Sequence, residues 1–150
     1  MTIAYRRMNQ GDTEAMIALR LAQLREEGAR EETDLAPALR DYYRRHLGDG
    51  SFISWLALDG DAIVGTSGLS IVEKPPYYGC PTGKIGLLSS MYTLPAYRRR
   101  GIARALLSRV TEEAGARGCG AVQITTSDMG VPLYTDFGFV KNGNFMQYKL

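Results

Sequence analysis

The sequence predicts one α/β (α+β) domain with a mixed, mostly antiparallel twisted sheet, a central βαβ unit and helices on both faces. Its 150 residues suit a single domain over residues 1–150. A strand, a helix and a further strand follow one another between residues 84 and 127, which predicts a right-handed crossover between parallel strands. Two earlier apolar runs meet at Asp59-Gly60, a hairpin signal that predicts antiparallel strands.

The first half of the chain alternates predicted strands and helices, and short polar residues and glycines mark the helix ends. The predicted elements are a strand over 3–8, a helix capped by Asp12 or Thr13, a second helix from Asp34 to Gly48, two strands within 51–74 and a loop over 75–83. His46, the sole histidine, lies with Arg44 and Arg45 in the last turn of the second helix. A capping role is favoured for it there.

The second half carries the βαβ unit and the end of the chain. The predicted elements are a strand over 84–94, a loop over 95–100, a helix over 101–118, a strand over 120–127, a turn over 128–133, a short helix near 133–137 and a hairpin over 138–150 that turns at Asn142-Gly143. The long helix carries one apolar stripe, formed by Ile102, Ala105, Leu106, Val110 and Ala114. Gly118 ends it.

Composition excludes several classes of protein. The net charge of +2, from 18 basic and 16 acidic residues, argues against a nucleic-acid partner. Two cysteines and one histidine support neither a disulfide framework nor a zinc site. We expect a cytoplasmic protein without a membrane partner, because no signal peptide and no apolar run of about 20 residues is visible.

A basic stretch from Arg98 to Arg104 precedes and opens the long helix. A helix N-terminus leaves amide N–H groups without partners and carries roughly half a positive charge, so it binds phosphate. Gly101 and Ala103 are small enough to let a pyrophosphate approach. The arginines alone fit an exposed loop equally well. Nucleic-acid binding is disfavoured, because interleaved aromatic residues are missing.

Residues 92–107, Tyr-Thr-Leu-Pro-Ala-Tyr-Arg-Arg-Arg-Gly-Ile-Ala-Arg-Ala-Leu-Leu, resemble the acetyl-CoA-binding segment of the GNAT (GCN5-related) N-acetyltransferase superfamily. Its pattern, Gln/Arg-x-x-Gly-x-Gly/Ala, is met by Arg98, Gly101 and Ala103. A second mark, Leu-Tyr-x-x-Phe-Gly-Phe, occupies residues 133–139. Both marks around a βαβ unit are far more specific than either alone. Ser90 departs from the asparagine frequent in one bacterial branch, which bears on the substrate side of the strand.

The resemblance implies transfer of acetyl from acetyl-CoA to a primary amine by direct attack in a ternary complex, without a metal. Tyr134 takes the family's general-acid position, although an aromatic side chain on a short helix also suits core packing. An ordinary tyrosine has a pKa of about 10 and can donate a proton at neutral pH. The residues implied in acetyl-CoA binding are Met91, Tyr92, Thr93, Arg98, Arg99, Arg100, Gly101, Ile102, Ala103, Arg104 and Asp128.

The general base and the acceptor stay open at this point. Glu73, Asp128, Glu26, Glu27 or a water molecule could take the proton of the amine. The acidic segment 25–34 could attract a cationic amine or be a solvated loop. The acceptor is a small-molecule or peptide amine, and the acyl preference beyond acetyl is undefined. A non-catalytic acyl-CoA-binding regulatory module is the alternative function. Dimers are frequent among relatives, so a homodimer is one expectation.

Overall fold

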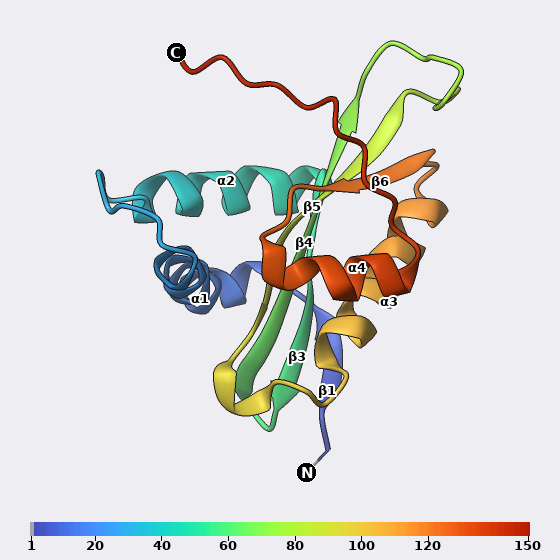
Figure 1. Cartoon of the computed structure of the whole chain (residues 1–150). Coiled ribbons are helices and arrows are strands. Elements are labelled where there is room, and N and C mark those ends of the chain that lie inside the picture. Colours follow the sequence, from blue (N-terminus) through green and yellow to red (C-terminus); the bar gives the residue numbers. More distant parts are fainter. Residues whose placement is uncertain (1) are drawn as a thin grey trace.

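A twisted six-stranded sheet runs through the computed structural model, which describes residues 2–150 (Figure 1). The strands are β1 (Ala4–Arg7), β2 (Phe52–Ile53), β3 (Trp55–Asp59), β4 (Ala62–Glu73), β5 (Lys84–Thr93) and β6 (Ala121–Ile124). Their order is β1-β3-β4-β5-β6, with β2 paired to β4. β5 and β6 are parallel, and the other pairs are antiparallel. The mixed sheet and its βαβ unit are therefore confirmed.

Helices cover both faces of the sheet, as predicted (Figure 1). They are α1 (Thr13–Glu26), α2 (Ala36–Asp49), α3 (Ile102–Ala116) and α4 (Val131–Phe137), with single 3₁₀ turns at η1 (Gln10–Asp12), η2 (Pro95–Tyr97) and η3 (Asp128–Gly130). The side chains of successive β3 residues point to opposite faces of the sheet. Leu56 and Leu58 pack with residues of α1 and α2, whereas Ala57 packs with Ile102 and Leu106 of α3. Within residues 2–150, no helix combines the length and apolar content that a membrane span requires.

The α3 helix lies very close to the sheet. Its Ile102, Leu106 and Val110 are at most 2% exposed, which confirms the main part of the apolar stripe. A Cβ atom added to Gly65 of β4 would lie 2.9 Å from Ile102 Cγ2. The absence of that atom lets the start of α3 pack directly on the strand. This contact places the N-terminus of α3 beside the end of β5.

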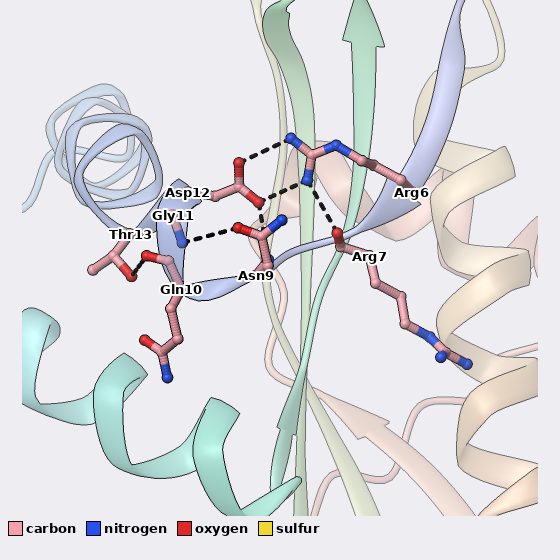
Figure 2. Close-up of polar contacts among 7 residues, drawn as sticks. All are labelled: Arg6, Arg7, Asn9, Gln10, Gly11, Asp12 and Thr13. Atoms are coloured by element: carbon pink, nitrogen blue, oxygen red, sulfur yellow. Dashed lines mark hydrogen bonds and ion pairs between the residues drawn. The ribbon is translucent and has the colours of Figure 1, made fainter.

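Asp12 lies at the N-cap position of α1, as predicted, but its side chain makes no capping hydrogen bond to that helix (Figure 2). It instead completes the cap of η1: Asn9 Oδ1 accepts the amide of Gly11 at 2.9 Å, and Asp12 Oδ2 accepts the amide of Asn9 at 2.9 Å. The Asp12 carboxylate is also paired with Arg6, whose Nη1 lies 2.7 Å from Oδ2. The carboxylate therefore joins β1 to η1 instead of capping α1.

The Arg6–Asp12 ion pair should make stability depend on pH. The hydrogen bond from Arg6 holds the pKa of Asp12 below its usual range. A carboxyl group whose pKa is lowered by folding stabilises the protein above its unfolded pKa, and this stabilisation is lost as pH falls through the folded pKa. We expect Asp12→Asn to lower the free energy of unfolding at neutral pH and to flatten its decline below about pH 4.

Urea unfolding at neutral pH and at roughly pH 3 measures both effects of the Asp12 substitution. Asp61→Asn, in the exposed turn after β3, is the control and should follow the wild type at each pH. If the Asp12 variant kept the full acid dependence of the wild type, the role assigned to this ion pair would be wrong.

Two further boundaries differ from the prediction. α2 continues through Gly48 to Asp49 and is ended by Gly50, whose φ of 78° gives the left-handed conformation typical of a helix C-terminus. The strand predicted before the hairpin is divided into β2 and β3 at Ser54. The division arises because the Ser67 hydroxyl accepts the amide of Trp55 at 2.9 Å and donates to its carbonyl at 2.8 Å, replacing the backbone ladder there.

The predicted hairpin over 138–150 is wrong. Residues 139–150 contain no helix or strand, and this segment runs away from the sheet to the C-terminus (Figure 1). Phe139 is held near Tyr134, with ring centroids 5.5 Å apart, but the large apolar side chains beyond it are exposed. Asn-Gly favours a turn without supplying a partner strand, and an isolated hairpin is only marginally stable.

Candidate active site

The site begins where β5 and β6 part. The two strands pair from Ile85 to Leu88 of β5, and β6 ends at Ile124. β5 continues to Thr93, still paired with β4 on its other side. Within residues 2–150, the side of β5 after Leu88 therefore has no strand partner. An extended ligand can bond to such an edge as an added strand.

A β-bulge interrupts β5 in this unpaired part. Ser89 pairs with Gly68 and Tyr92 with Thr66, so two residues of β5 lie opposite one residue of β4. Ser90 adopts a φ of 56°, and its carbonyl oxygen accepts a hydrogen bond from Thr66 Oγ1 at 2.7 Å. A bulge redirects the backbone groups that follow it. The sequence carried no signal for it, because serine rarely takes a positive φ.

The N-terminus of α3 faces the same region. Ala105 donates the first helical hydrogen bond, to the Gly101 carbonyl at 3.0 Å, so the amides of the preceding turn are not used within the helix. Gly101 has a φ of 78°, and a Cβ atom there would meet nothing within 4 Å. Arg99 also has a positive φ, of 64°. An open space in front of free helix amides is what a pyrophosphate needs.

Several arginines of the predicted phosphate site have structural partners. Arg98 Nε donates to the Thr93 carbonyl at 2.9 Å, and its Nη2 lies 2.7 Å from Glu26 Oε1. Arg104 Nη1 lies 2.8 Å from Asp136 Oδ2, which joins α3 to α4. The charges of Arg98 and Arg104 lie near the N-terminus of α3, but both side chains already form ion pairs that link neighbouring elements.

Tyr134 lies on α4, where it is both part of the core and at the cavity. It is 6% exposed within the core cluster beneath α3, and it also lines the cavity described below. Burial, with a smaller contribution from the charge of Glu27, raises the pKa of Tyr134 to about 12. Its hydroxyl is therefore protonated at neutral pH and can donate.

One cavity of about 1770 Å³ extends from the N-terminus of α3, through the gap between β5 and β6, to the end of α1. The predicted site residues that line it are Met91, Tyr92, Thr93, Arg98, Arg99, Gly101, Ile102, Ala103, Arg104 and Tyr134. Arg100 and Asp128 lie outside this lining. The Arg100 guanidinium is 5.5 Å from the centre of the Tyr97 ring, and Asp128 is exposed at the start of η3.

Gln23 is a residue of the site that sequence reasoning missed. It is 6% exposed on α1, and its Nε2 donates to the Met91 carbonyl at 3.3 Å, next to the bulge. The same Nε2 donates to Glu27 Oε1 at 3.3 Å. A signal existed: Gln23 follows the buried Met16 by seven residues, so a polar side chain occupies the apolar face of the helix.

Comparison with known proteins agrees with this geometry. Residues 14–139 match the profile of the acetyltransferase (GNAT) family. N-acetyltransferase 8B of Rattus norvegicus is 33% identical over 117 residues, which cover 75% of this chain and 49% of that protein. The chain thus spans about half the length of the curated relatives it matches.

Two crystal structures are similar over nearly the whole chain. A predicted acetyltransferase with acetyl-CoA from Clostridium acetobutylicum has a TM-score of 0.95 and 28% identity, covering 99% of this chain and 96% of that one. A GCN5-related N-acetyltransferase from Ralstonia eutropha JMP134 has a TM-score of 0.91 and 29% identity, covering 99% of both chains. The chain therefore shares its overall fold with both of these proteins.

Proposed function

Because this chain belongs to the acetyltransferase (GNAT) family, we propose that it transfers an acetyl group from acetyl-CoA to a primary amine, with both substrates bound together. One observation carries the proposal. The unpaired side of β5, the amide end of α3 and the protonated Tyr134 all open into a single cavity. An arrangement of this kind can hold a phosphate, align an extended arm and protonate a leaving group in one place.

The two ends of the cavity would share the binding of acetyl-CoA. The amides of Ile102, Ala103 and Arg104 are available for its pyrophosphate, and the charge of Arg99 lies beside them. The backbone of Met91–Thr93 is available for its pantetheine arm. The similar Clostridium protein was crystallised with acetyl-CoA, which supports this assignment.

Acetyl-CoA supplies a reactive thioester. The protein would polarise the thioester carbonyl and supply a proton to the departing sulfur. Amides that follow the bulge, those of Met91 or Thr93, would polarise the thioester carbonyl. Tyr134 would hold a proton for the departing sulfur. Its buried position keeps that proton in place through the neutral pH range.

Release of free thiol from acetyl-CoA tests this function. The purified chain is incubated with acetyl-CoA and each of several primary amines: a polyamine, an aminoglycoside, an amino-acid amide and a lysine peptide. We expect thiol release that requires both the protein and an amine, and a rise in melting temperature with acetyl-CoA alone.

Stabilisation by acetyl-CoA without thiol release from any amine would favour the alternative, a non-catalytic acyl-CoA-binding module. Neither stabilisation nor release would contradict both functions.

A further inference from the structure

Two of the four carboxylates that the sequence offers as a general base lie at the cavity. Glu26 and Glu27, at the end of α1, line it. Glu73 instead ends β4, where it pairs with the first residue of β5, and Asp128 is exposed at the start of η3. Neither belongs to the lining of the cavity among the described residues. Of the four candidate carboxylates, only Glu26 and Glu27 among the described residues therefore lie where a bound amine could reach them.

Glu26 is already engaged. Its Oε1 lies 2.7 Å from Arg98 Nη2, and the same guanidinium donates to the Thr93 carbonyl at 2.9 Å. The hydrogen bond from Arg98, with a smaller contribution from Tyr92, holds the pKa of Glu26 below its usual range. A carboxylate that an arginine already neutralises attracts a second cation weakly. Glu26 therefore joins α1 to the end of β5.

Glu27 is oriented by Gln23. Both hydrogen bonds of the Gln23 Nε2 atom are used, one for Glu27 Oε1 and one for the Met91 carbonyl, each at 3.3 Å. The Gln23 Oε1 atom accepts from Arg20 Nη1 at 3.0 Å. Turning the amide over would break all three bonds, so this buried side chain has one favoured orientation. It holds Glu27 in a defined position relative to the bulged part of β5.

The carboxylate of Glu27 is free to meet a ligand. Glu27 is exposed, and within residues 2–150 it has no arginine or lysine as an ion-pair partner. Its negative charge adds to the effect of burial in raising the pKa of Tyr134. Both side chains line the same cavity. A carboxylate and a protonated phenol are thus present at one site.

From this arrangement we propose that Glu27 binds the acceptor amine in its ammonium form, so that the preferred acceptors are amines that are cationic at neutral pH. This inference rests on the proposed acetyl transfer. Glu27 is then a catalytic residue, and Gln23 is a positioning residue that acts through it.

The protons balance in this reaction. Glu27 takes one proton from the ammonium group, and the neutral nitrogen forms the bond to the acetyl carbon while the carbon–sulfur bond breaks. Tyr134 gives its proton to the departing sulfur and regains one from water. The second proton of the nitrogen and the proton on Glu27 leave to solvent, so one proton is released for each amide formed.

Kinetics of Glu27→Gln with two kinds of acceptor test the proposal. The first kind is the best cationic amine of the thiol-release panel, and the second is aniline, which is uncharged at neutral pH. We expect kcat/KM for the cationic amine to fall about 30-fold, and kcat/KM for aniline to fall no more than about 3-fold. The KM for acetyl-CoA should stay unchanged. A melting temperature close to that of the wild type checks that the variant is folded.

Glu31→Gln is the matched control, because Glu31 is an exposed glutamate of the same acidic segment that pairs with Arg25. It should behave as wild type with both acceptors. Glu27→Asp, which keeps the charge, should recover part of the loss with the cationic amine.

Equal losses of Glu27→Gln with both acceptors, or no loss with the cationic amine, would overturn the role of Glu27 while leaving acetyl transfer intact. A wild-type protein that releases no thiol with any amine would instead show that the proposed function itself is wrong.

Discussion

Replacing Tyr134 with phenylalanine should lower kcat for acetyl transfer about 100-fold and leave the dissociation constant of acetyl-CoA nearly unchanged. The ring keeps its packing against Phe139 and the core, so the variant loses the proton donor without losing the fold. Thiol-release kinetics and a thermal-shift titration with acetyl-CoA separate the two quantities. An unchanged kcat would remove Tyr134 from the reaction.

Tyr97→Phe is the matched control for this result. Tyr97 also lines the cavity, but its hydroxyl already donates to Asp59 Oδ2 at 2.6 Å. We expect its kcat to stay close to wild type. If Tyr97→Phe lost as much kcat as Tyr134→Phe, the loss in the Tyr134 variant could not be assigned to proton donation.

The raised pKa of Tyr134 also predicts the pH dependence of the wild type. Because burial favours the neutral phenol, the hydroxyl ionises only as pH approaches about 12. The rate should therefore show no loss from ionisation of this acid below about pH 10, where an ordinary tyrosine would be half ionised. A decline that begins near pH 8 and disappears in Tyr134→Phe would contradict this.

Gly101→Glu should weaken acetyl-CoA binding by about 100-fold. The new carboxylate would occupy the open space in front of the first turn of α3 and would repel the phosphates electrostatically. A side chain at a φ of 78° also adds backbone strain of about 1 kcal/mol. Isothermal titration with CoA measures the affinity directly.

Gly60→Glu separates the local strain from the effect at the phosphate site. Gly60 has a φ of 61°, and a Cβ atom there would also meet nothing within 4 Å, but it lies in the turn between β3 and β4. The Gly60→Glu variant has the same added charge and a similar backbone strain, but residue 60 is not part of the cavity lining. It should bind CoA as the wild type does. If Gly101→Glu also bound CoA normally, the phosphate site assigned to α3 would be wrong.

The elements predicted correctly are those whose pattern is local. The apolar stripe that begins at Ile102 and the glycine at 118 define α3, and the Asp59-Gly60 turn defines the β3–β4 hairpin. The terminal hairpin failed although its Asn142-Gly143 signal is equally local. A turn signal predicts the bend, whereas a strand forms only where another strand or edge pairs with it.

By itself the sequence determined the family and the helix that opens at Gly101, and it predicted the role of Tyr134, because these depend on residue types at short, fixed spacings. The tertiary structure decided the rest of the site. The hydrogen bond from Gln23 to Met91 spans 68 residues, and the pair of Arg98 with Glu26 spans 72. Such partners arise from the packing of α1 against β5, and no spacing along the chain encodes them or the bulge at Ser90. That packing leaves Glu27, rather than its neighbour Glu26, free to face the amine.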